Sequence, residues 1–500
     1  MSGIIIFVAL GQTLWSKGYG WEGWDPYMNE AAFSLIQTTD GGYAVAGYEE
    51  SNGFENLMLL KLSQDGTREW CRWLSGNNHR AVSVLQLSDG SLLVCGQESP
   101  FFYWNFLLAK VSSSGSLQWI KTYSLANRNI YAEDLIQSSA SDFLVAGTFG
   151  GNNWDIALAK LSSSGGINWT KAYGGSGEDY GYSVAKAVDN SGYAITGYTK
   201  SFGDPKGDVI VIKVGTDGTV IWAKTYGGTN YDAGHSITGT SDGGFLVVGT
   251  TYSFGAGQND ILVLKVASDG ALEWAKSFGT SGYEWGYSGI QLSGGDYVVA
   301  GGNGGVALRI GPDGTLRWQK RFPASPSGWW HFRDVIQASD GTLVFAGKGS
   351  ISTDEDMFVM KIAANGEYPN CVSDASLIPN DVVAVEDVPG ITTTTVSITS
   401  NNYNATFDPV TPTQADFCAS VPVYEGSSED TFNFSPHVVA ASVSGGLVFI
   451  SQMATGLRVY SSDGRLVYCG DLLRGENRIN LDQGVYLWES GQYKGKAVVR

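Results

Sequence analysis

Short runs of alternating apolar and polar residues follow one another along most of the chain, and small turn-forming residues separate them. In residues 34–47, two such runs flank the pair Asp40 and Gly41. Alternation with a period of two predicts strands with one buried face, and an Asp-Gly pair between two strands predicts a tight hairpin turn. Residues 61–70 predict a third and a fourth strand around a second Asp-Gly pair, and they end on Trp70. The pattern therefore predicts four antiparallel strands in about 50 residues.

These two phrases form an internal repeat. The second phrase ends on a tryptophan every 44 to 53 residues, at Trp70, Trp119, Trp169, Trp222, Trp274 and Trp318. The first phrase ends on a glycine seven times, at Gly47, Gly96, Gly147, Gly197, Gly249, Gly301 and Gly347. Four-stranded units repeated in this way are typical of a β-propeller. We therefore predict an all-β, seven-bladed β-propeller over residues 12–371, in which the recurrent tryptophan is a wedge between blades.

The seventh copy lacks its last strand. It begins at Lys361 and reaches Asn365 and Gly366, but no tryptophan follows. Residues 13–19, which contain Trp15, match the fourth strands of the other copies. Adding this N-terminal strand to blade seven would remove an exposed sheet edge. We expect the N-terminal strand to close the ring in this way.

Composition narrows the choice of partners. The chain has 31 basic and 49 acidic residues and a net charge of −18, which disfavours nucleic acid as a partner. No apolar run approaches the ~20 residues of a membrane helix, so no membrane span is predicted. With five Cys, no CxxC pair and four His, no zinc site is indicated. We predict no cofactor.

The sequence contains no recognisable catalytic constellation. It has no GxSxG, HExxH or P-loop motif, and its four histidines are scattered. The many Asp-Gly pairs fall at predicted turns and are explained by turn chemistry. We therefore predict no catalytic residues.

The loops that differ between copies carry the candidate ligand-binding residues. A residue shared by nearly every blade serves the blade, whereas a site is expected where the copies differ. The aromatic residues chosen on this basis are Trp24, Trp104, Trp154, Trp285, Trp329 and Trp330. Exposed aromatic rings beside carboxylates suit stacking on sugar rings. The alternative is that these side chains pack between blades.

Four carboxylates occupy equivalent positions at the entry to the first strand of their copies: Glu30, Asp179, Asp232 and Glu284. Because innermost strands line the channel of a propeller, these residues could form a partial acidic ring at its mouth that binds a cation. The alternative, which we favour, is local hydrogen bonding to the loop backbone.

The ends of the propeller region carry segments of another kind. Residues 1–11 contain an apolar stretch that suits a secretory signal, with a buried strand as the alternative. Residues 372–424 are rich in Thr, Ser, Asn, Val and Pro, and predict an extended linker. Cys371 and Cys418 bracket this segment. We expect them to form a disulfide, as in an oxidising compartment, with two unpaired thiols as the alternative.

The C-terminal residues 425–500 predict a small β-sandwich. Residues 457–467 predict a strand followed by an Asp463-Gly464-Arg465 turn; a Gly-Val-Tyr-Leu strand follows at 484–487, and the chain ends on a basic and apolar strand at 496–500. In this order the three features resemble the type A C-terminal sorting domain of the type IX secretion system of Bacteroidetes. The Asp-Gly-x-x-x-Trp phrases also resemble repeats of secreted bacterial propellers. These resemblances imply export to the outer cell surface or beyond, by secretion machinery that recognises this domain.

We therefore expect a secreted or cell-surface binding or adhesion propeller that recognises a glycan or protein through its aromatic-rich loop face. One alternative is a glycan-degrading enzyme, either a glycoside hydrolase or a polysaccharide lyase. A convergent carboxylate pair ~5–10 Å apart would favour the hydrolase. The other alternative is a purely structural surface protein, which would be favoured if the aromatic residues are buried between blades.

Overall fold

The computed structural model describes residues 14–20, 29–51, 53–74, 78–99, 103–151, 153–322, 330–350 and 355–368, and from residue 373 onward only the strands named below. The chain divides into two units, Met1–Phe417 and Cys418–Arg500, and each is described by itself. All regular elements in the described residues are β-strands.

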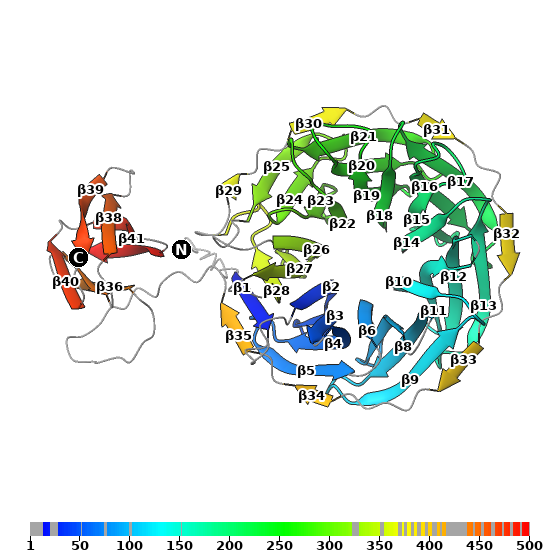
Figure 1. Ribbon diagram of the computed structural model, residues 1–500, viewed down its shortest axis with the longest axis horizontal. Coiled ribbons are helices and arrows are strands. Elements are labelled where there is room, and N and C mark those ends of the chain that lie inside the picture. The colour runs from blue at the N-terminus through cyan, green and yellow to red at the C-terminus, as the bar shows by residue number, and fades with distance from the viewer. Residues whose placement is uncertain are drawn as a thin grey trace, which may run out of the picture. The chain divides into compact units, whose positions relative to one another are not determined.

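The first unit is a ring of antiparallel sheets around a central axis (Figure 1). Blade 1 contains β2 (Asn29–Gln37), β3 (Tyr43–Ser51), β4 (Phe54–Leu62) and β5 (Arg68–Leu74); blade 2 contains β6 (His79–Gln86), β7 (Leu92–Glu98), β8 (Asn105–Val111) and β9 (Leu117–Ser124); blade 3 contains β10 (Ile130–Gln137), β11 (Asp142–Phe149), β12 (Asp155–Ser162) and β13 (Ile167–Gly174); blade 4 contains β14 (Asp179–Lys186), β15 (Tyr193–Thr199), β16 (Asp208–Val214) and β17 (Val220–Gly227); blade 5 contains β18 (Asp232–Gly239), β19 (Phe245–Thr251), β20 (Asp260–Val266) and β21 (Leu272–Gly279); blade 6 contains β22 (Gly286–Gln291), β23 (Tyr297–Gly301), β24 (Val306–Ile310) and β25 (Leu316–Arg321); blade 7 contains β26 (Trp330–Gln337), β27 (Leu343–Ser350) and β28 (Glu355–Ile362). The predicted all-β, seven-bladed propeller is confirmed.

The fourth strand of blade 7 is β1 (Trp15–Gly20), from the other end of the chain. It pairs antiparallel with β28, with Trp15 opposite Lys361. The Trp15 indole Nε1 donates to the carbonyl oxygen of Gln64 at 3.0 Å, and the Tyr19 hydroxyl donates to that of Gly66 at 2.6 Å. Both acceptors belong to the turn between β4 and β5, so β1 connects blade 7 to blade 1.

The same contact recurs between other blades. The indole Nε1 atoms of Trp70, Trp222 and Trp274 each donate to a backbone carbonyl in the corresponding turn of the next blade, at 2.8 to 3.0 Å. A Cβ atom at Gly66 would lie 2.6 Å from the Trp15 ring, and Gly66 has a φ of +78°. The turn therefore needs glycine both for its backbone conformation and for the approach of the tryptophan. This geometry is that of the aromatic wedge inferred from the repeat.

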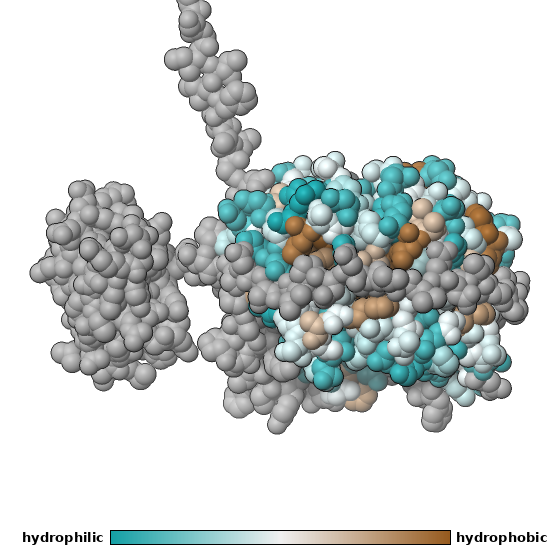
Figure 2. Space-filling model, turned by 90° about the horizontal axis from the view of Figure 1, so that it is seen from above, coloured by the Kyte–Doolittle hydropathy of each residue, from teal (hydrophilic) through white to brown (hydrophobic). Residues whose placement is uncertain are grey.

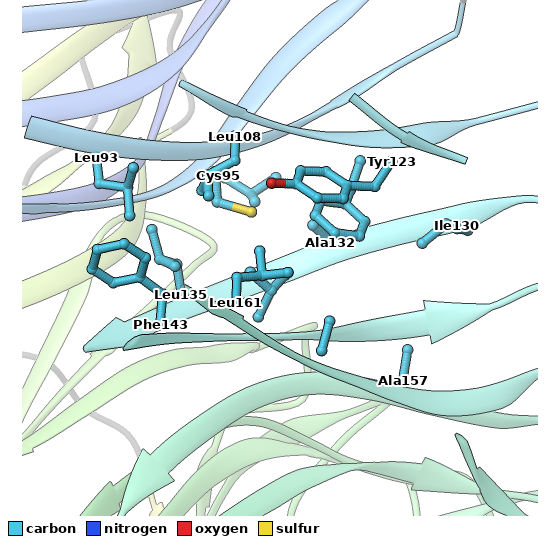
Figure 3. Close-up of a cluster of buried hydrophobic side chains, with 14 of the residues drawn as sticks. Leu93, Cys95, Leu108, Tyr123, Ile130, Ala132, Leu135, Phe143, Ala157 and Leu161 are labelled. Carbon is cyan, nitrogen blue, oxygen red and sulfur yellow. The ribbon is translucent and has the colours of Figure 1, made fainter. Parts of the chain in front are cut away.

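Apolar side chains pack mainly between neighbouring blades. Between blades 2 and 3, Leu93 and Cys95 pack with Leu135 and Phe143 (Figure 3). Five further clusters join blades 1 and 2, 3 and 4, 4 and 5, 5 and 6, and 7 and 1. The burial of each blade thus depends on its neighbours.

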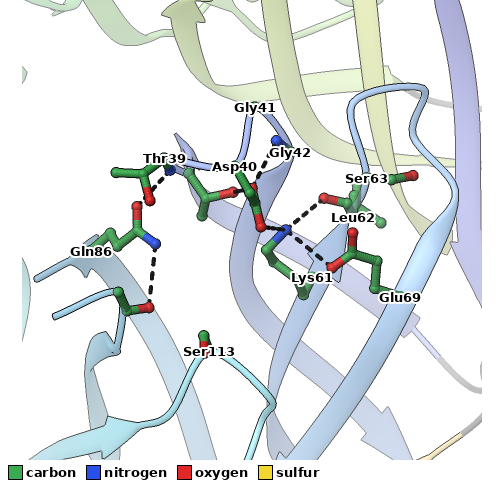
Figure 4. Close-up of polar contacts among 12 residues, drawn as sticks. Thr39, Asp40, Gly41, Gly42, Lys61, Leu62, Ser63, Glu69, Gln86 and Ser113 are labelled. Carbon is green, nitrogen blue, oxygen red and sulfur yellow. Dashed lines mark hydrogen bonds and ion pairs between the residues drawn. The ribbon is translucent and has the colours of Figure 1, made fainter.

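The recurrent lysine of the third strand holds the first turn of its own blade. Lys61 Nζ lies 2.9 Å from Asp40 Oδ2 and 3.2 Å from Glu69 Oε2 (Figure 4). Burial would raise the pKa of Asp40, but hydrogen bonds from Thr38 and Lys61 lower it to about 2. From blade 2, Gln86 Oε1 accepts a hydrogen bond from the backbone N–H of Thr39 at 2.8 Å. The turn is therefore held within its blade and attached to the next one.

Residues 373–416 add a fifth strand to every blade, which corrects the expectation of a linker. The strands pair antiparallel with the outer blade strands in reverse order: β29 (Ser373–Asp374) with β25, β30 (Ile378–Asp381) with β21, β31 (Val385–Asp387) with β17, β32 (Thr392–Thr395) with β13, β33 (Thr399–Asn402) with β9, β34 (Asp408–Val410) with β5, and β35 (Thr413–Asp416) with β1. We call residues 373–416 the belt (Figure 1). Each strand has only two to four residues, so its alternation is too short to recognise, and its partner is the far edge of a distant blade.

The second unit contains two antiparallel sheets. One has the order β36 (Val438–Val443), β37 (Gly446–Ser451) and β40 (Gly475–Asn480), and the other has the order β39 (Leu466–Leu472), β38 (Thr455–Ser461), β41 (Gly484–Ser490) and β42 (Tyr493–Val499). In the described part of the chain, no helix has the length and hydropathy of a membrane span.

The coloured residues on the side of the propeller that Figure 2 shows are mainly hydrophilic or weakly hydrophobic. Figure 2 views this unit edge-on, and hydrophobic residues form small separate areas in it. Among the described residues, the large hydrophobic side chains that are more than a third exposed are spread over several blades: Phe54, Tyr103, Val188, Ile221, Tyr252 and Tyr283.

Replacing Trp15 tests ring closure by the N-terminal strand. Trp15 is 6% exposed and fills the junction of blades 7 and 1. Trp15→Ala should lower the free energy of unfolding by about 3–5 kcal/mol, because it leaves a cavity and an unpaired carbonyl at Gln64. Urea unfolding of the full chain measures the loss.

Trp70→Ala is the matched comparison, since Trp70 makes the equivalent contact between blades 1 and 2. Both variants should lose stability to a similar extent. A Trp15→Ala variant as stable as the wild type, beside a destabilised Trp70→Ala variant, would show that β1 does not close the ring.

Candidate functional site

Every innermost strand has a β-bulge at the same place. In β2 the register shifts between Ala32 and Ser34, and the other six inner strands shift at the equivalent step. The seven bulged residues are Phe33, Val82, Glu133, Tyr182, His235, Tyr287 and Arg333. A bulge re-aims the side chain of the extra residue.

These seven side chains, together with Arg80, line a cavity of about 350 Å³. One bulged residue comes from each blade, so the cavity lies on the propeller axis inside the ring of inner strands visible in Figure 1. We call it the axial cavity. Its volume falls within the range of small-molecule sites, about 300–1,000 Å³.

The residue after each bulge has a structural role. It is Ser or Asp in all seven blades. Asp334 Oδ2 accepts from the backbone N–H of Leu35 at 2.8 Å, which links blade 7 to blade 1, and Asp134 Oδ2 accepts from that of Val184 at 3.0 Å, which links blade 3 to blade 4. Repeated residues therefore hold the blades together, while the bulged residues beside them differ in every blade but two.

The charged groups of the axial cavity are not equivalent. Arg80 forms an ion pair with Glu55. Burial raises the pKa of Glu133 to about 7, against the opposing effects of Arg80 and of a 3.1 Å hydrogen bond from Gln97 Nε2. Arg333 makes no ion pair with a described residue, and its guanidinium carbon lies 4.0 Å from the centre of the Tyr287 ring. Within the described part of the chain, the guanidinium of Arg333 therefore has no counter-ion.

An aromatic wall adjoins these groups. His235 stacks on Tyr287 with ring centres 5.9 Å apart, and Tyr182 meets the other side of His235 edge-on at 5.6 Å. His235 Nδ1 lies 2.8 Å from the carbonyl oxygen of Gly286, so it must donate, and in the neutral ring Nε2 carries the lone pair. Burial lowers the pKa of His235, and the nearby Arg333 lowers it further.

A second aromatic group crosses blades 2 to 5 at the end of the inner strands where they enter the ring. Its rings contact one another in the order Trp104, Tyr131, Trp154, Tyr180, Tyr198, Tyr231 and Tyr252, with centres 5.0 to 6.0 Å apart. We call these seven residues the aromatic arc. The rings from Tyr131 to Tyr198 are nearly parallel, with interplanar angles of 9° to 23°. They therefore cover each other's faces and present mainly their edges.

The aromatic residues predicted from the sequence fall into three groups. Trp104 and Trp154 are half-buried members of the arc. Trp285 is also half-buried and stacks on the exposed Tyr283 at 5.9 Å, away from the arc. Trp24 and Trp329 lie outside the described residues, as does the side chain of Trp330, the first residue of β26.

The four predicted channel carboxylates do not line the axial cavity. Glu30, Asp179, Asp232 and Glu284 are at most 2% exposed. Asp179 Oδ2 accepts from Gly175 N at 2.8 Å, and Glu284 Oε2 accepts from Thr280 N at 3.0 Å. The four carboxylates are therefore not part of the axial cavity, and Asp179, Asp232 and Glu284 bond to their own entry loops, the interpretation favoured from the sequence.

Three of these carboxylates are close to a second acid from the preceding blade. A Cβ atom at Gly174 would lie 2.3 Å from Asp155 Oδ1 and 2.6 Å from Asp179 Oδ2, so both carboxylates converge on that glycine. Burial raises the pKa of Asp260 to about 6, and Glu284 adds to the rise. Among the described residues, no three His, Cys, Asp or Glu side chains are grouped to hold a metal ion.

The predicted disulfide falls outside the described residues, since neither Cys371 nor Cys418 is among them. Cys71 and Cys95 are buried and free, and burial raises the pKa of Cys71 to about 12. These two thiols are packing residues.

Sequence reasoning missed the axial cavity. It compared the copies four residues before the conserved Ser or Asp, whereas the cavity residues stand directly before it. A signal was present, because this position varies among Phe, Val, Glu, Tyr, His and Arg between strongly repeated neighbours. The repeat pattern does not reveal a bulge, so this residue would be assigned to the wrong face of the strand.

No protein-family model matches the chain, and no curated protein matches it. Solved structures similar to it include Sqt1 from Chaetomium thermophilum, with 12% identity and a TM-score of 0.42 over 71% of this chain and all of that one. A Bacteroides caccae protein of unknown function gives 12% identity and a TM-score of 0.35 over 53% of this chain and 88% of that one. An extracellular domain from B. thetaiotaomicron gives 13% identity and a TM-score of 0.38 over 96% of this chain and 58% of that one.

Glu133→Gln should remove a pH dependence of stability. Because the pKa of Glu133 is raised from 4.5 to about 7, the folded chain keeps a proton that the unfolded chain releases as the pH rises through this window. The carboxyl group therefore costs stability on the order of 1–3 kcal/mol at pH 8. In urea unfolding, the free energy of unfolding of Glu133→Gln should rise relative to that of the wild type as the pH increases from 4.5 to 8.

Asp40→Asn is the control for this experiment. The pKa of Asp40 is lowered to about 2, so its stabilising effect is lost only below about pH 4. The difference in the free energy of unfolding between Asp40→Asn and the wild type should stay constant between pH 4.5 and pH 8. A constant difference for Glu133→Gln as well would contradict the raised pKa.

Proposed function

We propose that the chain is a secreted or cell-surface binding propeller that recognises a neutral polysaccharide through its aromatic arc. The arc itself is the observation that carries this proposal. Seven rings from four blades touch in sequence, so the surface is held rigid before any ligand arrives. Rigid binding surfaces lose little conformational entropy on association.

The chemistry of the arc favours a hydroxyl-rich ligand over an apolar protein surface. Its inner rings cover one another, and Tyr252 is its only ring that is more than a third exposed. Five of its seven rings are tyrosines, which combine an apolar body with a hydroxyl at the edge. The net charge of −18 disfavours polyanions, so a neutral chain is the best match.

The four carboxylates predicted at the strand entries do not favour a glycan-degrading enzyme. A hydrolase needs two carboxyl groups on the substrate side, roughly 5–10 Å apart. Glu30, Asp179, Asp232 and Glu284 are buried, and the last three bind their own entry loops. This set therefore does not supply a catalytic pair.

The double variant Trp154→Ala, Tyr180→Ala tests glycan binding by the arc. Each ring contributes about 1.5–3 kcal/mol when a ligand fully covers it, so partial covering of two rings should still weaken binding at least ~10-fold. A neutral glycan array with the full chain identifies the ligand, and titration measures the loss.

The control is Val188→Ala, Ile221→Ala, which removes exposed apolar groups outside the arc. Val188 lies in the turn between β14 and β15, at the opposite end of those strands from the arc. Control binding should equal that of the wild type. If the arc variant binds as well as the control, or if the wild type retains no neutral polysaccharide, the proposal is wrong.

The export route rests on the C-terminal resemblance. In sequence, Asp463, Gly464 and Arg465 stand between the end of β38 and the start of β39, and the Gly-Val-Tyr motif opens β41. This agreement of motif and strand supports residues 425–500 as a type IX sorting domain that secretion machinery recognises and removes. The resulting location is the outer surface or the medium.

Truncation after Pro436 tests the sorting domain. The truncated chain keeps every blade strand and the whole belt, so it should show the thermal unfolding of a folded propeller. In a bacterium with type IX secretion it should remain in the periplasm, as measured by fractionation and surface proteolysis. Mass spectrometry of the full-length product should place the mature end between Ala419 and Pro436. Surface delivery of the truncated chain would contradict the proposal.

A further inference from the structure

We propose that the axial cavity binds a small carboxylate carried on a six-membered ring, with Arg333 as the anchor of the carboxylate. This site adjoins the aromatic arc, since the rings of Tyr182 and Tyr198 lie with their centres 6.1 Å apart, but it has its own lining and takes a different ligand. The inference therefore does not depend on the proposed polysaccharide.

Arg333 is the residue of the axial cavity that favours an anionic ligand. Its guanidinium carbon lies 4.0 Å from the centre of the Tyr287 ring and 5.7 Å from that of Phe33. Its Nε atom is buried and has no hydrogen-bond partner among the described residues. Arg333 as a whole is half-buried, and partial removal of a cation from water is costly unless an anion or acceptors compensate it. The planar guanidinium fork fits a carboxylate, which can accept two parallel hydrogen bonds.

The other charged groups near Arg333 already have partners within the protein. Arg80 is paired with Glu55. Asp334, the neighbour of Arg333, accepts hydrogen bonds from the backbone of Leu35 at 2.8 Å and from the Ser288 hydroxyl at 2.9 Å. Glu133 enters from blade 3, whereas Arg333 enters from blade 7, and Arg80 is the cation whose charge lowers the pKa of Glu133. The positive charge of Arg333 is therefore available to a ligand.

The walls of the cavity suit a ring. Tyr182, His235 and Tyr287 are consecutive around the axis and form a continuous aromatic side. His235 Nε2 supplies an acceptor within this side, since Nδ1 donates to Gly286. A ligand ring can lie against these residues while its carboxylate reaches Arg333. The volume of about 350 Å³ suits a single ring better than an oligosaccharide.

The net charge of the protein does not oppose such a ligand. A monocarboxylate brings one charge, and the Debye length at physiological salt is about 8 Å, so distant acidic residues act weakly. A polyanion would bring many charges, which the net charge of −18 repels.

Two pairs of probes test the site with the full chain. Glucuronate is compared with glucose, and benzoate with benzyl alcohol, by calorimetric titration and by ligand-observed NMR up to about 10 mM. At least one acid should bind, and its neutral counterpart should bind at least ~10-fold more weakly, because a hydrogen-bonded charge pair is lost. Binding of glucuronate alone would assign the site to sugar acids, and binding of benzoate alone to aromatic acids.

Arg333→Met removes the anchor while keeping an apolar side chain of similar length. It should weaken binding of the acid ~10- to 100-fold and leave the neutral probe unchanged. Arg128→Met is the matched control, because Arg128 is exposed and does not line the cavity. Arg333→Lys keeps the positive charge but lacks the planar guanidinium group. Its affinity for the acid should lie between those of Arg333→Met and the wild type.

Thermal unfolding separates binding from folding. The bound acid should raise the Tm of the wild type and of Arg128→Met, but not that of Arg333→Met, whose own unfolding should remain cooperative. The arc variant Trp154→Ala, Tyr180→Ala should keep acid binding, so this inference and the proposed function can fail independently. Equal binding by Arg333→Met and the wild type, equal binding of acid and neutral probes, or no binding of either acid would overturn the proposal.

Discussion

The propeller depends on one repeated contact, the packing of an aromatic fourth strand against the turn of the next blade. The tryptophan indole and the tyrosine hydroxyl of that strand both donate to backbone carbonyls of the neighbouring turn, as Trp15 and Tyr19 do at the turn of blade 1. Because these acceptors lie in another blade, no blade satisfies its polar groups or buries its apolar face alone. The stability of the ring is therefore shared by its junctions, and the weakest junction limits the whole.

Within each inner strand of this ring, the residue that lines the axial cavity stands directly before a residue with a structural role. The residue after each bulge is Ser or Asp, and in blades 1, 2, 3, 4, 6 and 7 it bonds to a neighbouring blade, whereas the bulged residue lines the axial cavity and changes from blade to blade. A bulge lets these two roles stand side by side, because it redirects one side chain without disturbing the pairing on either side. The same scaffold can thus carry different axial cavities through seven independent substitutions.

Much of the fold was predictable, because the signals were local and repeated. Alternation, Asp-Gly turns and the tryptophan period identified seven four-stranded blades. The belt was not predictable, since strands as short as Ser373–Asp374 carry no period and pair with an edge distant in sequence. At the candidate site, Trp104 and Trp154 were found from their loops, but their mutual stacking with tyrosines of other blades depends on three-dimensional register. The axial cavity was missed for the same reason, because the direction of a bulged side chain such as Arg333 is a property of strand pairing and not of sequence period.

The belt gives the propeller a mechanical property. Its seven strands lie in series along one segment of 44 residues, 373–416, while each is held only by a short pairing to one blade. A pull on the chain beyond residue 417 meets these pairings one at a time, beginning with β35 on β1, and not the blades behind them. Complete peeling would release a tether of about 150 Å, at roughly 3.4 Å per residue, with the strands of the ring still paired. A protein held by its C-terminal end could therefore lengthen under load and absorb work before its binding surfaces are disturbed.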